Sequence, residues 1–140
     1  MPVELIDFVQ DFSIALKAAD ARKPQAQNSR SKELFQPGIG PHSESRTVQL
    51  VTAELRAIRP DAYEQVGINI SYPESPRQKC DLCVGKAVEN WDWAIEVKML
   101  RLLGDNGKPN DNILMHILSP YAAHRSALTD CAKFGSHEAW

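Results

Sequence analysis

Residues 79–100 read KCDLCVGKAVENWDWAIEVKML, and both halves of this segment alternate between apolar and polar side chains. Such alternation is typical of a strand with one buried face. The apolar positions are Cys80, Leu82 and Val84 in the first half, and Trp93, Ile95, Val97 and Met99 in the second. Polar residues between the halves favour a turn. The segment therefore predicts two neighbouring strands that form a hairpin.

Two carboxylates and one ammonium group are expected on one face of this hairpin. Glu96 and Lys98 lie two residues apart on the second strand, so their side chains lie on the same side, roughly 7 Å apart. Asp81, on the first strand, can point the same way. Because like charges repel at short range and Lys98 offsets only part of the charge, a divalent metal is the natural missing partner. Mg²⁺ binds one or two carboxylates together with water and phosphate oxygens, and it can activate water.

The order Asp81, then Glu96-Val97-Lys98, resembles the motif of the PD-(D/E)XK nuclease superfamily, which has the restriction-endonuclease-like fold. Asp81 stands in the place of the motif aspartate, and Cys80 stands before it in place of proline. The resemblance implies an endonuclease that hydrolyses DNA phosphodiester bonds with Mg²⁺ or Mn²⁺. It implies that Asp81 and Glu96 bind the metal, with Val97 as a further candidate in the metal site. Lys98 would position or activate the attacking water.

Two alternatives remain open for these residues. An E-V-K tripeptide occurs by chance in many strands, where its charged groups form a solvated cross-strand ion pair that contributes little stability. At the level of the whole chain, the alternative is a non-catalytic binding or assembly module that keeps the same fold. Metal affinity separates this module from a nuclease.

Composition places the chain among ordinary globular domains. Its 140 residues, 43% of them hydrophobic and 24% charged, suit one domain with its own core. No stretch approaches the ~18 consecutive apolar residues that span a bilayer, and the N-terminal MPVELIDFVQDF has acidic residues where a signal peptide has basic ones. We therefore expect a cytoplasmic protein without a membrane segment. The formal charge of -2 neither supports nor excludes DNA binding, because net charge hides local patches.

The pair Cys80-x-x-Cys83 invites a zinc or redox interpretation. On a strand, however, positions three apart face opposite sides of the sheet. The sequence contains no second CxxC, and its four histidines show no ligand spacing. We therefore expect buried free thiols.

The N-terminal third predicts a helix followed by a long loop. Residues 2–20 have apolar side chains at helical spacing, namely Leu5, Val9, Phe12 and Leu16. Residues 21–43 are rich in Pro, Gly, Ser, Asn and Gln, which predicts a mobile loop. Its basic residues include Arg30 and Lys32, which are candidates to contact DNA phosphates. A solvated linker is the alternative.

A second helix is expected from Ser43 to Ile58, where Arg59-Pro60 stops it. Its buried stripe consists of Val48, Val51, Leu55 and Ile58. Extending that stripe back by four residues reaches Glu44, which should face the sheet at the N-terminal end of the helix. The helix dipole favours an anion there, so a capping role is one interpretation. The resembled family often draws a metal-site glutamate from this helix, which makes Glu44 the third candidate ligand, preferred to Glu54.

The remaining segments complete the expected order of elements. Residues 63–71 alternate as a strand through Val66, Ile68 and Ile70, and the two prolines in residues 72–79 favour a loop. Beyond Leu100, Asp111 is expected to cap a short helix that ends near Ile117. Ser119-Pro120 then predicts the start of a helix over residues 120–134, ended by Gly135. His124 and Arg125, near its start, are candidate phosphate contacts, with solvated surface residues as the alternative.

We therefore expect a single α/β domain over residues 1–140, with a core that spans residues 44–140. The resemblance implies an αβββαβ core, a mixed central sheet flanked by helices. Only residues 136–140 follow the last helix, so the final strand should be short, missing from a fragment, or supplied by a partner at an open sheet edge. Many enzymes of this family work as dimers, which makes a homodimer a candidate assembly.

Overall fold

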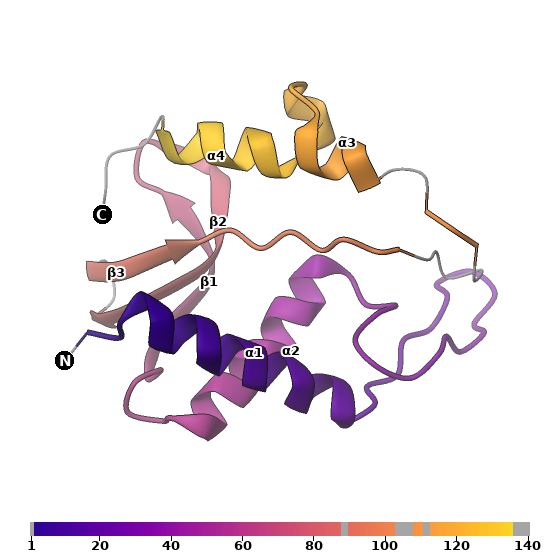
Figure 1. Cartoon of the computed structure of the whole chain (residues 1–140), viewed down its shortest axis with the longest axis horizontal. Coiled ribbons are helices and arrows are strands. Elements are labelled where there is room, and N and C mark those ends of the chain that lie inside the picture. Colours follow the sequence, from indigo (N-terminus) through magenta and orange to yellow (C-terminus); the bar gives the residue numbers. More distant parts are fainter. Residues whose placement is uncertain (1, 88–89, 103–107, 111–112, 136–140) are drawn as a thin grey trace.

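The computed structural model describes residues 2–87, 90–102, 108–110 and 113–135. A three-stranded antiparallel sheet in the order β1-β2-β3 lies beside one pair of helices, and a second helical pair lies on the other side of an extended segment (Figure 1). The elements are α1 (Leu5–Ala21), α2 (Glu44–Ile58), β1 (Gln65–Tyr72), β2 (Ser75–Ala87), β3 (Asn90–Ile95), α3 (Ile113–Leu118), a 3₁₀ turn (Ala122–His124) and α4 (Ala127–Gly135). The predicted α/β class is confirmed. The described sheet is antiparallel throughout, so the mixed sheet is not found in this part of the chain, and the expected last strand at 136–140 lies outside it.

The main core lies between the sheet and the helices α1 and α2. Helix α2 begins and ends as predicted. Ser43 caps its start by accepting a hydrogen bond from the Arg46 N–H. The predicted stripe of α2 is also confirmed, since Val48, Val51 and Leu55 are buried. They pack with Leu82 and Val84 of β2 and with the buried Tyr63, whose hydroxyl donates to Asp11 of α1.

The predicted face of α1 is confirmed in part. Phe12 and Leu16 pack against the main core. Leu5 and Val9, however, are exposed, whereas Phe8, Ala15 and Ala19 are buried. The two alanines allow α1 to approach α2 closely, and close packing outweighs the burial of larger side chains at the helix start.

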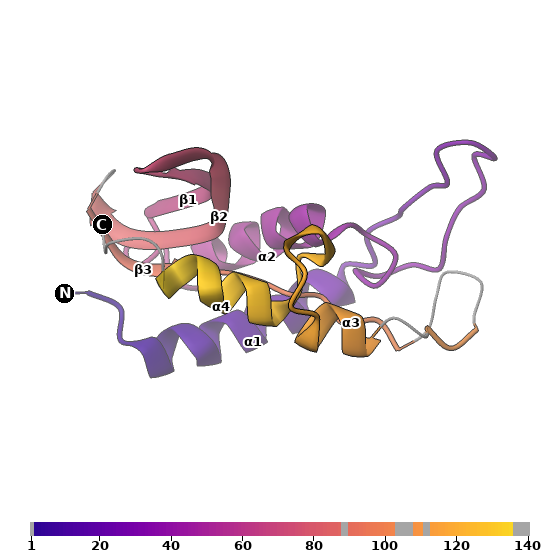
Figure 2. The same cartoon turned by 90° about the horizontal axis from the view of Figure 1, so that it is seen from above.

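Residues 22–43 form a loop that extends away from the helices (Figure 2). The loop is organised by a short antiparallel contact between Gln27 and Leu34 and by the Asn28 side chain, which accepts from the backbone of Arg30 and Ser31.

The hairpin of β2 and β3 is confirmed, with Leu82 opposite Ile95 and Val84 opposite Trp93. β2, however, starts at Ser75, so the loop predicted over 72–79 is wrong. Pro76 fits inside this strand because it lies where the register to β1 shifts, and a proline at such an irregularity costs no ladder hydrogen bond.

The strand β1 switches faces at Asn69, whose backbone has a φ of 55°. Asparagine tolerates this left-handed conformation better than most residues. Before the switch, Val66 and Ile68 pack in the main core. After it, Ile70 packs on the opposite face, over Gly67. The simple alternation predicted for β1 is therefore wrong beyond Ile68.

The face of Ile70 holds a second cluster with Tyr72, Cys80, Cys83 and Trp91. The prediction that Cys80 and Cys83 face opposite sides is wrong, because the distortion of the sheet brings both thiols together. Both are buried and free, as predicted.

The helix predicted over 120–134 is broken. Arg125 has a φ of 48°, and Ser126 caps the shorter α4 by accepting from the Thr129 N–H. Ser126 thus takes the capping role assigned to Ser119, whose Oγ instead accepts from the Tyr121 N–H in the preceding turn. Asp111 lies outside the described residues. None of the helices in the described ranges is long and apolar enough to cross a bilayer.

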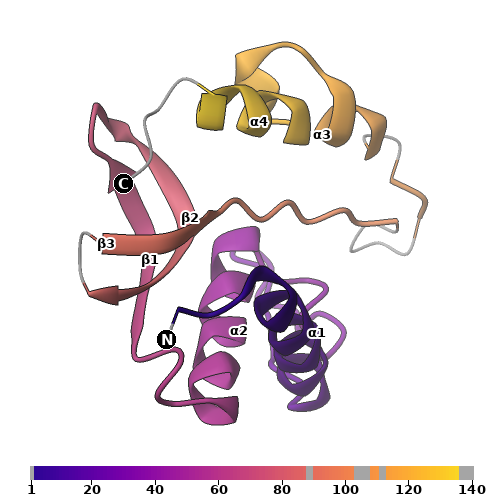
Figure 3. The same ribbon diagram turned by 60° about the vertical axis from the view of Figure 1, so that its left-hand side comes forward.

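After β3, residues 96–102 leave the sheet and run between the two helical layers (Figure 3). We call these residues the bridging segment. The predicted second strand of the hairpin extended to Met99, so this prediction overestimates the strand, and Glu96 and Lys98 lie beyond its end.

The hairpin tolerates no side chain at Gly85. A Cβ there would lie 2.5 Å from the Asn90 carbonyl oxygen and 2.9 Å from the Trp91 Cα, both backbone atoms. We expect Gly85→Ala to lower the free energy of unfolding by about 1–3 kcal/mol, measured by urea denaturation. Gly40→Ala is the control, because a Cβ at Gly40 meets no described atom within 4 Å. Equal stabilities for the two variants would contradict this packing.

Candidate functional site

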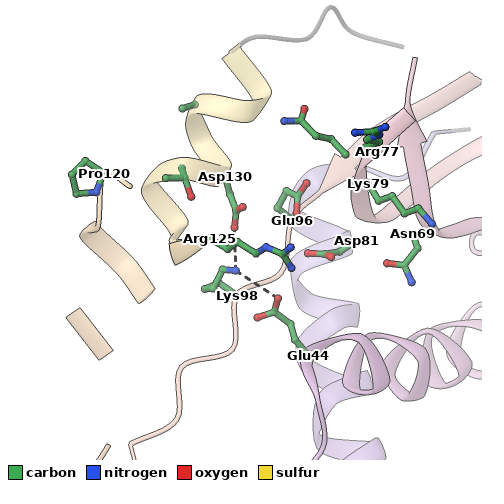
Figure 4. A pocket seen from close by; sticks show the side chains of 13 residues that line it. Glu44, Asn69, Arg77, Lys79, Asp81, Glu96, Lys98, Pro120, Arg125 and Asp130 are labelled. Atoms are coloured by element: carbon green, nitrogen blue, oxygen red, sulfur yellow. Dashed lines mark ion pairs between the residues drawn. The ribbon is translucent and has the colours of Figure 1, made fainter. Parts of the chain in front are cut away.

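An open cavity of about 710 Å³ lies between β2, the start of α2, the bridging segment and α4 (Figure 4). Within the described part of the chain, eight charged side chains line it. Four are acidic and four are basic: Glu44, Asp81, Glu96 and Asp130, and Arg77, Lys79, Lys98 and Arg125. These residues come from distant parts of the sequence, so the fold gathers them.

Asp81 and Glu44 hold the bridging segment in place. The Val97 N–H donates to Asp81 Oδ2 at 2.8 Å, and the Met99 N–H donates to Glu44 Oε2 at 2.7 Å. Alternate N–H groups of an extended chain point the same way, so the two carboxylates bind one side of the segment. Lys98, between them in sequence, is thereby fixed at the cavity wall.

Lys98 lies between two carboxylates of different helices. Its Nζ is 3.6 Å from Glu44 Oε1 and 3.4 Å from Asp130 Oδ2. The side chains of Lys98 and Asp130 are only 20% and 16% exposed, so solvent screens their attraction less than it screens a surface pair. The ion pairs of Lys98 therefore join it to α2 and α4.

Glu96 is bound from the thiol-bearing face of the sheet. Tyr72 donates its hydroxyl to Glu96 Oε1 at 2.8 Å. Burial, and then this hydrogen bond, raise the pKa of Tyr72 well above its ordinary value, so the phenol remains a donor. The hydrogen bond to Cys80, together with burial, raises the pKa of the Cys83 thiol. The Tyr72 hydroxyl is therefore a neutral donor that orients the Glu96 carboxylate.

The structure brings together most of the residues predicted for the site. Asp81, Glu96, Lys98, Glu44 and Arg125 all line the cavity. Val97 contributes its backbone N–H to Asp81, while its side chain packs against the main core.

Other predicted residues lie elsewhere. His124 is in the turn before α4, but it does not line the cavity, and Arg30 and Lys32 are on the loop that leaves the helices. Glu54, the rejected competitor of Glu44, is buried and forms an ion pair with Arg22.

Sequence reasoning missed Asp130, Asn69, Arg77 and Lys79. The two basic residues carried a usable signal, because Arg77, Lys79 and Asp81 are spaced by two and share a face once β2 is known to begin at Ser75. Asp130 carried no such signal, since an acidic residue in a short amphipathic helix is most simply a solvated one.

The carboxylates of the cavity are oxygen ligands of the kind that a hard divalent cation prefers, but they do not by themselves surround an ion. Among the described residues, no group of three or more His, Cys, Asp or Glu side chains is arranged to hold a metal ion. Mg²⁺, however, needs only one or two carboxylates when water and substrate phosphate complete its shell. Asp81 of β2 and Glu96 of the bridging segment are oxygen donors of this kind that line one cavity.

No family model, curated protein or solved structure matches this chain. The resemblance to the PD-(D/E)XK superfamily therefore stays a prediction.

The pair of Lys98 with Asp130 should hold α4 against the bridging segment. We expect Asp130→Asn to lower the stability of α4 by about 1 kcal/mol, which corresponds to roughly fivefold faster amide exchange in that helix. Hydrogen exchange followed by mass spectrometry measures this change, and α2 should be unaffected. Asp92→Asn, at an exposed residue of β3, is the control. Unchanged exchange in α4 would contradict this role of Asp130.

Proposed function

We propose that the protein is a metal-dependent nuclease that hydrolyses DNA phosphodiester bonds at the cavity lined by Glu44, Asp81, Glu96 and Lys98. The observation that supports the proposal is their convergence. A helix start, a central strand and the bridging segment contribute carboxylates and an ammonium group to one open cavity. This set of groups suits chemistry on an anionic substrate.

A bound cation would make the charge balance of the cavity more favourable to phosphate. Its four carboxylates and four basic groups cancel formally, so the carboxylates oppose part of the attraction that the basic groups exert on a phosphodiester. A divalent ion held by Asp81 and Glu96 leaves a net charge of about +2. Such an ion, when bound, supplies Lewis-acid stabilisation of the phosphoryl oxygen and activates water.

Glu44, Asp81 and Glu96 have distinct tasks under this proposal. Asp81 and Glu96 would hold Mg²⁺ or Mn²⁺ while keeping their hydrogen bonds to the Val97 N–H and the Tyr72 hydroxyl. Glu44 tunes the site from α2 and orients Lys98, because it contacts both the Met99 N–H and the Lys98 ammonium.

Lys98 provides a positive charge at the wall of the cavity. Its ammonium is held by Glu44 and Asp130, so it reaches the cavity in a fixed orientation. There it can position the attacking water and stabilise the charge that develops on the phosphate.

A non-catalytic module with the same fold is the second candidate. The observation that favours it is that Asp81 and Glu44 already accept backbone N–H groups, a structural use that needs no metal.

Cleavage assays test the proposal directly. Supercoiled plasmid, linear duplex and single strands are incubated with the protein in Mg²⁺ or Mn²⁺, with EDTA as the control. We expect metal-dependent cleavage, and Lys98→Ala should slow it by about 10²-fold or more, as for the loss of one charge-stabilising donor. Lys17→Ala, at an exposed position of α1, should cleave at the wild-type rate. Absence of cleavage, or equal rates for the two variants, would count against the nuclease.

Metal binding provides a readout that is independent of cleavage. A cation that binds only the folded state raises its stability by RT ln(1 + [L]/Kd), so mM Mn²⁺ should raise the Tm of the wild type. Asp81→Asn should remove this increment, while its amide oxygen can still accept the Val97 N–H. Asp92→Asn should keep it. A wild-type Tm that ignores both metals would favour the non-catalytic module.

A further inference from the structure

We infer that the cavity takes single-stranded DNA, which passes between the β1–β2 hairpin and the turn that precedes α4. This inference rests on the proposed function and specifies its substrate. It comes from three features: basic side chains without partners on two opposite walls, an exposed aromatic ring in the turn that borders the cavity, and the size of the cavity.

Three basic side chains of the cavity have no partner. The side chains of Arg77, Lys79 and Arg125 form no ion pair or hydrogen bond with any residue in the described ranges, unlike that of Lys98. In Figure 4, Arg125 reaches in from the side of α4, while Arg77 and Lys79 stand on β2 across the cavity. Cations on both walls match a chain of phosphates that runs between them.

The turn before α4, which borders the cavity through Pro120, carries an exposed ring. Tyr121 is 68% exposed, and its neighbour in sequence, Pro120, lines the cavity with Arg125. The Tyr121 ring contacts the His124 ring edge-on, with centroids 5.5 Å apart.

Hydrogen bonds fix this turn. Ser119 Oγ lies 2.6 Å from His124 Nδ1 and accepts from the Tyr121 N–H, and the His124 N–H donates to the Tyr121 carbonyl. The exposed ring is therefore held in place and does not pack into the core. Proteins that bind single strands use such rings to stack bases, beside a basic groove that follows the backbone.

The dimensions and the ring both select against a duplex. A cavity of about 710 Å³ lies in the size range of sites for small ligands, which suits one or two nucleotides. The bases of a duplex are stacked on each other, so none can reach Tyr121 without leaving the helix. An unpaired strand satisfies the cations and the ring together.

Binding in EDTA tests the inference without cleavage. Fluorescence anisotropy is measured with a labelled single-stranded DNA 12-mer, the duplex of the same sequence and the matching RNA. We expect the single-stranded DNA to bind at least about tenfold more tightly than the duplex. Tyr121→Ala should raise Kd by about 5- to 150-fold, the range for one stacked base, while Tyr121→Phe should retain wild-type binding. Tighter binding of the duplex or of RNA would overturn the inference.

The cations give a second measurement. Each of Arg77→Ala and Arg125→Ala should weaken single-strand binding and reduce the slope of log Kd against log[salt] by about 0.7. Lys17→Ala is the matched control and should change neither quantity. Unchanged slopes in both arginine variants would overturn the placement of the strand.

The two proposals fail separately. Selective single-strand binding without cleavage in Mg²⁺ or Mn²⁺ would retain this inference and reject the nuclease. Metal-dependent cleavage by a protein that binds duplex more tightly would do the opposite.

Discussion

Two hydrogen bonds from the bridging segment to carboxylates are the constraint on which the site depends. Asp81 and Glu44 accept the Val97 and Met99 N–H groups at a point where the chain has left the sheet and where none of the described strands pairs with it. Partly buried N–H groups need acceptors, and here side chains from β2 and α2 replace the missing strand. The result is that Glu96 and Lys98 are presented to a cavity instead of to a neighbouring strand.

The same contacts explain why acidic side chains gather without a cage of protein ligands. A carboxylate that accepts a backbone N–H has one oxygen engaged, which lowers the cost of burying its charge. Lys98, between Glu44 and Asp130, offsets part of the remaining repulsion. The fold can therefore carry four acidic residues around one cavity in the absence of metal, and the oxygens turned toward the cavity are what the proposed function uses.

Local patterns in the sequence carried much of this arrangement. The stripe of α2 and its Ser43 cap could be predicted, and with them the position of Glu44, because helical periodicity and capping are local. The β2–β3 hairpin followed from alternation for the same reason. The face switch at Asn69 could not be predicted. A single left-handed residue turns the following side chains to the other face of the sheet, but the alternation of apolar and polar residues in the sequence continues unchanged. The break at Arg125 was missed because Ser119 and Ser126 are equally good caps by sequence, and tertiary packing chooses between them. Asp130 was missed with it, since its role depends on where α4 lies.

The position of α4 links entry into the cavity to the ion pairing of Lys98. Asp130 of α4 holds the Lys98 ammonium from one side, and Arg125, just before α4, faces the carboxylates from the same side. A phosphate that enters between α4 and β2 is attracted by Arg125 and competes with Asp130 for Lys98, because both are anions near one cation. Under the proposed function, substrate entry would thus transfer Lys98 from a structural ion pair to the reacting phosphate. If Lys98 were paired with Glu96 of its own segment, it would not be held by α4, and a phosphate entering beside α4 could not displace such a contact. The pairing of Lys98 with Asp130 across the cavity therefore has a physical reason.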